Sequence, residues 1–163
     1  ASLSINSISK LVAPAKAIRS LPISSAAINK SPTLMIPDDQ DAKLFLELFG
    51  KVYVMDNEKK FTTAASYSAF YGWIFRIMNE AANWGEENGL EKENALEIIR
   101  DVLSNVSEMS KKDAHIPLEN IVESLATKGG ITEQGLNIIE GKKGFDVWRE
   151  ALNSVHLRLS GKD

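Results

Sequence analysis

The feature that most constrains this chain is a change of pattern near residue 58. Beyond it, apolar residues recur at steps of three and four in one segment after another, which places them on one face of an α-helix. Ahead of it, short apolar runs alternate with helical stretches. This pattern predicts a mostly α protein whose strands are confined to its first third.

Residues 1–57 predict a small α/β portion. Thr33–Ile36 and Lys51–Met55 are expected to be buried strands, and Lys16–Ser20 a further short strand. Asp38 is expected to cap a helix between the two buried strands, because its carboxylate can accept the free N–H groups of the first turn. The strand–helix–strand order predicts the βαβ pattern of a parallel sheet. Three strands cannot bury both faces of such a sheet, so we expect more sheet on the N-terminal side.

Residues 58–163 predict an all-helical domain of five helices. The first is long and ends near Asn88-Gly89, and the second is expected from residue 91 to residue 110. The inward face of the second helix is expected to carry Ala95, Ile98, Ile99, Val102, Leu103, Val106 and Met109. The last helix has an apolar seam suited to another helix, made of Phe145, Trp148, Leu152, Val155 and Leu159. Apolar stripes this wide favour a partner subunit, and we expect a homodimer.

Composition excludes several classes of function. The chain has no cysteine, which rules out disulfides, thiolate zinc sites, iron–sulfur ligation and a cysteine nucleophile. A net charge of −3 without a basic block argues against nucleic-acid binding, and the longest nearly uncharged apolar stretch is too short to span a membrane. His115 and His156 lack metal-ligand spacing, so we expect no metal site and assign no catalytic residue. We expect a cytoplasmic protein.

One turn combines features of an anion-binding site. Gly129 and Gly130 remove side chains where a ligand can approach the backbone, and Thr132 opens a helix directly after them. Free N–H groups at a helix start, together with the helix dipole, attract a carboxylate or a phosphate. Thr127 and Thr132 add two hydroxyls to the same turn. A plain helix–turn–helix link with a glycine break and a threonine cap explains the same residues, and this alternative stays open.

The same segment resembles the C-terminal signature of the pyrroline-5-carboxylate reductases, which typically read Ser-Pro-Gly-Gly-Thr-Thr, then Gly or Ala with Leu, then Leu-Glu and Gly-Phe. The matching residues here are Thr127, Gly129, Gly130, Thr132, Gly135-Leu136, Glu140 and Gly144-Phe145. The resemblance extends over nearly the whole chain. Arg19-Ser-Leu-Pro22 resembles the family's Arg-x-Met-Pro, and Thr63-Ala64 with Ser66-x-Ser68 resembles the start of its long helix.

The resemblance implies an oxidoreductase of proline biosynthesis that reduces 1-pyrroline-5-carboxylate to L-proline with NADP or NAD as cofactor. It implies the last βαβ portion of an incomplete Rossmann-type domain in residues 1–57 and a helical dimerisation and substrate-binding domain in residues 58–163. Carried over by position, Gly129, Gly130 and Thr132 bind the substrate carboxylate, and Thr127 replaces the family's serine. The implied partners are a small substrate with a carboxylate and a second copy of the chain, within a homodimer or a larger assembly.

The chain departs from the family at several positions, including Lys128 for the usual proline and Ile131 for the first threonine, and two departures bear most on function. No Gly-x-Gly-x-x-Gly/Ala turn occurs, so we expect a C-terminal fragment that is inactive alone and binds NAD(P)H poorly. Tyr67, Ala69 and Phe70 stand where the family has glycine, glycine and proline, which enlarges a substrate wall. Two alternatives therefore stay open: a non-catalytic helical dimerisation module, and a related Rossmann reductase acting on another imine or keto acid.

Overall fold

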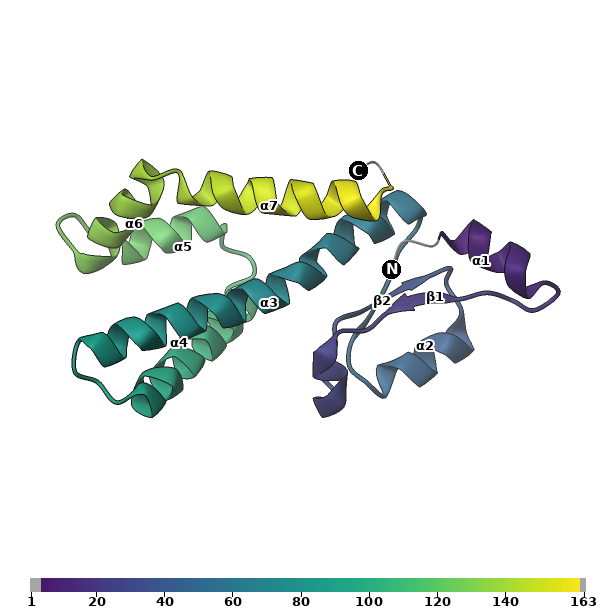
Figure 1. Cartoon of the computed structure of the whole chain (residues 1–163), viewed down its shortest axis with the longest axis horizontal. Helices are drawn as coiled ribbons and strands as arrows, with labels where there is room; N and C mark the ends of the chain where they lie inside the picture. The colour runs from purple at the N-terminus through teal and green to yellow at the C-terminus, as the bar shows by residue number, and fades with distance from the viewer. Residues whose placement is uncertain (1–3, 162–163) are drawn as a thin grey trace. The chain divides into compact units, whose positions relative to one another are not determined.

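The computed structural model describes residues 4–161 of the chain (Figure 1). Within those residues it contains seven α-helices, one short 3₁₀ helix and three strands. Contacts divide the chain into two compact units, the first made of residues 1–71 and 150–163 and the second of residues 72–149. The division falls inside the long helix α3 (Glu58–Glu87). A domain boundary at residue 57 stays a prediction.

The first unit is built on a sheet with the strand order β1–β2–β3. Strands β2 (Thr33–Ile36) and β3 (Val52–Val54) are parallel and are joined by α2 (Gln40–Glu47), which confirms the βαβ unit. Strand β1 (Arg19–Leu21) is antiparallel to β2. The short return through the 3₁₀ helix η1 (Ser24–Ile28) allows this, because a parallel pair needs a longer crossover.

Helix α2 begins one residue later than expected. Its N-cap is Asp39 and not Asp38, and the Asp39 Oδ1 atom accepts the Ala42 N–H at 2.8 Å. Asp38 is therefore a wrong prediction, because the chain turns into the helix only after it. Lys16 Nζ donates to the other carboxylate oxygen of Asp39, and this bond, followed by that from Ala42, lowers the pKa of Asp39.

Helix α3 begins on the sheet and completes the core of the first unit. Asn57 caps it by accepting the Lys60 N–H at 2.9 Å. Phe61 and Ala65 pack with Ile36 of β2, and the partly buried hydrophobic residues around them are Leu21, Leu34, Met55 and Leu159. The sequence therefore places the core of this unit between one sheet face and the first turns of α3.

An ion pair fixes the start of α3 against β1. Arg19 Nη1 lies 2.5 Å from Glu58 Oε2, and the guanidinium lies 4.2 Å above the centre of the Phe61 ring. The other Glu58 oxygen accepts the N–H of Ile5, the first residue of α1 (Ile5–Val12). The Arg19 side chain is only 11% exposed, so this pair is screened by water less than a surface pair. It ties three elements of the unit together.

The second unit is a frame of helices. The latter part of α3 and α4 (Lys92–Lys112) form an antiparallel hairpin (Figure 1). The helices meet closely there, because a Cβ atom at Gly85 would lie 3.2 Å from that of Ala95. Helices α5 (Leu118–Leu125) and α6 (Ile131–Gly141) follow, and then the beginning of α7 (Gly144–Leu159), whose residues from 150 onward belong to the first unit. Trp148 at the start of α7 meets Trp73 of α3 edge-on, with ring centroids 5.7 Å apart.

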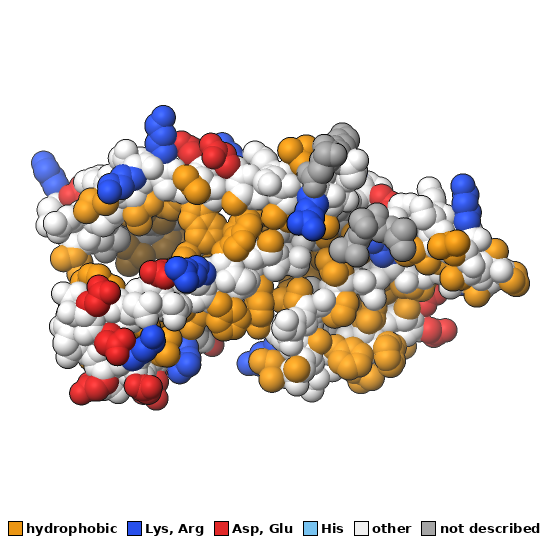
Figure 2. All heavy atoms as spheres, viewed as in Figure 1, with side chains coloured by type: hydrophobic (Ala, Val, Ile, Leu, Met, Phe, Trp, Pro, Cys, Tyr) orange, Lys and Arg blue, Asp and Glu red, His pale blue; other side chains and the backbone are white. Residues whose placement is uncertain are grey.

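This frame has little core of its own. Among the described residues of the unit, the buried hydrophobic side chains are those of Ala82 and Ala95. Four α4 residues expected to face inward are 51–62% exposed, namely Ile98, Val102, Val106 and Met109. That expectation is wrong for the single chain, because no helix of the unit covers this stripe. Figure 2 shows hydrophobic side chains bordering a hollow among these helices.

Candidate functional site

The glycine turn between α5 and α6 has a defined geometry. The Gly130 N–H donates to the Thr127 carbonyl oxygen at 2.8 Å, and Gly129 in the third position has a φ of +77°. A positive φ in that position is typical of a type II turn, which requires glycine there. The turn is open to solvent at Thr127, Gly129 and Thr132. The expected break between two helices is therefore confirmed.

Gly130 is needed for a different reason. Its φ of −82° is available to any residue, but a Cβ atom there would lie 2.7 Å from Thr127 Oγ1 and 2.9 Å from the Thr127 carbonyl oxygen. Nothing lies within 4 Å of a Cβ atom at Gly129. The two glycines therefore serve separate functions. Gly129 allows the positive φ of the turn, and Gly130 leaves room for the side chain and carbonyl of Thr127.

Glu133 was not among the residues expected at this turn, yet its side chain is bound there. Its Oε2 atom accepts the Gly129 N–H at 2.7 Å. Glu133 is the third residue of α6, where a glutamate commonly reaches back to an amide ahead of the helix. The spacing Gly129-Gly130-x-x-Glu133 is the signal that could have predicted this bond.

The amides of both glycines thus have acceptors within the chain. The first intrahelical bond of α6 runs from the Gln134 N–H to the Gly130 carbonyl at 3.0 Å. The amides of Ile131 and Thr132 precede that bond and have no acceptor of this kind. The positive end of the α6 dipole lies at the same place. An anion that accepts from these two amides would compete with Glu133 for the amide of Gly129.

The first unit contains a separate apolar cavity of about 250 Å³. Its floor is a row of cross-strand neighbours, Leu21, Leu34 and Tyr53, which the register places side by side on one sheet face. The other lining residues are Ile23, Pro32, Met55, Ala64, Tyr67 and Ser68. The cavity therefore continues the core of the unit outward, between the same sheet face and α3.

This cavity brings together two segments that the sequence analysis singled out separately. Leu21 and Ile23 flank Pro22 of the first segment, and Ala64 and Ser68 belong to the second. Tyr67 lines the same cavity and is 63% exposed. Its spacing of one helical turn from Tyr71 favours packing in the core, and the exposure of Tyr67 shows that this interpretation is wrong. The cavity lies in the first unit, whereas Thr127–Thr132 belong to the second.

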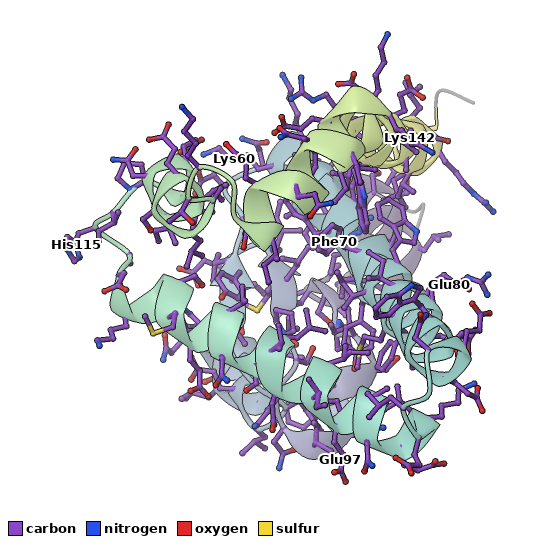
Figure 3. The ribbon with its side chains drawn as sticks, turned by 90° about the vertical axis from the view of Figure 1, so that its left-hand side faces the viewer. Lys60, Phe70, Glu80, Glu97, His115 and Lys142 are labelled. Carbon is purple, nitrogen blue, oxygen red and sulfur yellow. The ribbon has the colours of Figure 1, made fainter. Side chains whose placement is uncertain are left out.

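The two histidines lie outside both the glycine turn and the apolar cavity. His115 is on the exposed link between α4 and α5, where Figure 3 draws it pointing away from the helices. Nδ1 of His156 is buried without a hydrogen-bond partner. Across residues 4–161, the structure contains no group of three or more His, Cys, Asp or Glu side chains placed to hold a metal ion. No helix in that range is long and apolar enough to cross a membrane.

The residues present do not fit a complete nicotinamide dinucleotide. Such a cofactor needs a glycine-rich turn for its pyrophosphate, and none of the ten glycines forms a Gly-x-Gly-x-x-Gly pattern. The glycine turn described above follows a helix and not a strand. No phosphate contact can therefore be assigned to this chain.

Comparison with known proteins places most of the chain in one family. The protein-family model for pyrroline-5-carboxylate reductase dimerisation matches residues 58–160. Among curated relatives, the pyrroline-5-carboxylate reductase of Staphylococcus haemolyticus is 22% identical over 107 residues, which are 66% of this chain and 39% of that protein. The enzyme of Staphylococcus saprophyticus is 23% identical over 121 residues, or 72% of this chain and 44% of the relative. The chain thus spans about two fifths of the curated relatives it matches.

Solved structures show the same fold over nearly the whole chain. A Plasmodium falciparum pyrroline carboxylate reductase with NADP bound superposes with a TM-score of 0.89 at 18% identity, covering 99% of this chain and 66% of the other. The 1-pyrroline-5-carboxylate reductase of Streptococcus pyogenes gives 0.88 at 20% identity, covering 99% and 65%. The expected fold class is confirmed: an all-helical dimerisation domain follows the last βαβ portion of an incomplete Rossmann-type domain.

Proposed function

The chain belongs to the pyrroline-5-carboxylate reductase family, and on that premise we propose that its natural full-length form reduces 1-pyrroline-5-carboxylate to L-proline with NADP or NAD. The observation that supports this most is the glycine turn, which lies inside the matched region and exposes helix-start amides beside two threonine hydroxyls. Proline biosynthesis is the corresponding role.

We propose that the turn binds the carboxylate of the substrate. The amides of Ile131 and Thr132 have no acceptor in the α6 ladder, and the Thr132 hydroxyl is on the same exposed turn. A carboxylate accepts hydrogen bonds from such amides strongly because it is charged. Gly129 and Gly130 keep side chains out of its way, and Thr127 closes the turn. The chain's contribution to the reaction is then to position the substrate by charge complementarity.

The cofactor would supply the hydride, which is the chemistry common to nicotinamide-dependent reductases. The chain holds no phosphate-binding turn, so its own residues are assigned only to substrate binding and dimerisation. We infer that the chain alone is inactive.

A homodimer is the proposed assembly. The exposed stripe on α4 and the near absence of a core in the second unit leave apolar surface that folding normally buries. Size-exclusion chromatography with light scattering on the chain should give twice its mass of 18.0 kDa. Val102→Glu, in the middle of the stripe, should shift the chain to a monomer, whereas Ser104→Glu on an exposed neighbour should not. A monomeric wild-type chain at micromolar concentration would contradict the assembly.

Kinetics of the full-length protein test the substrate site. Thr132→Ala should raise the KM for 1-pyrroline-5-carboxylate about ten- to a hundredfold, because a hydrogen bond to a charged group contributes about 1.5–3 kcal/mol. Thr132→Ser keeps the hydroxyl and should stay close to the wild-type KM. An unchanged KM in Thr132→Ala would remove this residue from the site.

A second candidate function is a non-catalytic helical dimerisation module. The absence of any glycine-rich phosphate turn from these 163 residues favours it. Full-length protein that dimerises but oxidises no NAD(P)H with pyrroline-5-carboxylate would support the module. Oxidation with only another member of a panel of imines and keto acids would instead support a related reductase of different substrate.

A further inference from the structure

The glycine turn holds a carboxylate that belongs to the chain itself. Glu133 Oε2 accepts the Gly129 N–H at 2.7 Å, and Glu133 stands in the first turn of α6, where the helix dipole favours negative charge. In the free chain the turn therefore binds the same chemical group that the proposed substrate presents to it. That group is tethered four residues away along the chain.

Little else holds the Glu133 carboxylate in place. In the part of the chain that the structure describes, no lysine, arginine or histidine forms an ion pair with it. The bond to Gly129 is exposed, so water can take the place of either partner. A change of side-chain rotamer breaks the contact without any movement of the backbone. The contact is therefore reversible at small cost.

A bound Glu133 affects an incoming carboxylate in two ways. It takes one donor, the amide of Gly129. It also places a negative charge beside the amides of Ile131 and Thr132, which precede the first bond of the α6 ladder. Two carboxylates at one site repel each other, so the second binds well only when the first leaves. Because Glu133 is tethered, dilution does not reduce its concentration at the turn.

We propose that Glu133 makes an autoinhibitory contact with the glycine turn, and that the substrate carboxylate displaces it on binding. The inference rests on the proposed function, because it concerns the regulation of the same turn. In the free chain Glu133 satisfies the Gly129 amide, and in the bound state the external carboxylate takes over that position. Glu133 therefore stabilises the empty turn and weakens its affinity for ligands that carry a carboxylate.

Replacing Glu133 should change stability and affinity in opposite directions. Glu133→Ala removes both the charge and the acceptor, so it should lower the Tm of the chain by about 2–4 °C, as loss of a helix cap does. The same variant should bind a carboxylate more tightly than wild type. Glu133→Gln keeps an acceptor at the same length without the charge, so its effects should be intermediate. A glutamate with a purely structural role would lower both stability and affinity on replacement.

Amide NMR on the chain measures the affinity, with sodium acetate as the probe and sodium chloride at equal concentration as the reference. Acetate should shift the amide signals of Gly129, Ile131 and Thr132. Its Kd should be about two- to fivefold lower in Glu133→Gln than in wild type, the contribution of one charge at a helix start, and at least as low in Glu133→Ala. The control Glu119→Gln removes the same charge from the opposite end of α5 and should bind acetate like wild type.

Three results would overturn the autoinhibitory role of Glu133. Acetate could bind Glu133→Ala no more tightly than wild type, or Glu119→Gln could show the same gain as Glu133→Gln, and the turn would in both cases remain an anion site. A lack of acetate shifts in every variant would show that there is no anion for Glu133 to exclude. The proposed function is decided separately, because an unchanged KM in full-length Thr132→Ala contradicts it even where acetate binding follows the expected order.

Discussion

Replacing each glycine of the turn by alanine separates two physical effects. In Gly130→Ala the new methyl group lies 2.7 Å from Thr127 Oγ1 and 2.9 Å from the Thr127 carbonyl oxygen. The hydroxyl can rotate away, but the carbonyl is held by the bond it accepts from the Gly130 N–H at 2.8 Å. Overpacking of this kind costs about 1–3 kcal/mol of unfolding free energy. In Gly129→Ala the space is open, and only the φ of +77° opposes the change, at about 1–2 kcal/mol.

Thermal unfolding of the purified chain measures both effects. About 1 kcal/mol shifts the Tm of a chain of this size by about 2–4 °C, so Gly130→Ala should lower it by about 2–12 °C. Adding Thr127→Ala to Gly130→Ala removes the contact with the hydroxyl but not that with the carbonyl, so only part of the loss should be recovered. Wild-type stability in Gly130→Ala, or complete recovery of stability on adding Thr127→Ala, would refute a clash with the carbonyl oxygen.

Two further outcomes concern residues outside the glycine turn. Gly50→Ala should destabilise the chain strongly, because the φ is +135° and a Cβ atom would lie 2.4 Å from the Ser31 backbone. In the control Gly72→Ala, the new Cβ atom meets nothing within 4 Å inside α3, so this variant should be slightly more stable than wild type. Urea unfolding of the two variants measures both changes in stability. The pKa of Asp39 is lowered from 3.8, so its stabilising effect is present above that pH and is lost as the pH falls through the lower folded value. Asp39→Asn keeps the cap, so the stability difference from wild type should shrink below pH 3.8; a constant difference down to pH 2 would contradict the assignment.

Local order along the chain was largely predictable from the sequence. The Asn88-Gly89 pair located the end of α3, and the pattern of apolar residues placed β2 and β3. These signals are local, since they depend on a few neighbouring residues. The antiparallel pairing of β1 was not predictable in the same way, because a short strand reveals nothing of its direction until its connection to the next strand is known.

Burial was predicted less well, and the cause differs between the two units. In α4, the apolar spacing correctly predicted a helix, but Val102 and Met109 are exposed. The spacing shows which residues share a helix face, and it does not show whether another element covers that face. In α3, Tyr67 has the spacing of a core residue, yet its ring lines a cavity that the sheet register creates from Leu21, Leu34 and Tyr53. Neither outcome is encoded in one segment alone.

The glycine turn shows how one physical rule supported both a correct and an incomplete inference. The positive end of α6 attracts negative charge, which is why an anion was expected at Gly129 and Gly130. The same attraction acts on Glu133, whose carboxylate is tethered to the helix and has already taken the Gly129 N–H. The sequence locates such a site through its free backbone donors. The affinity of the site for an external carboxylate depends on how much more favourably that carboxylate binds these donors than the Glu133 carboxylate does. For that reason Thr132, whose amide lies ahead of the first helical bond, carries more of the proposed binding than the glycines beside it.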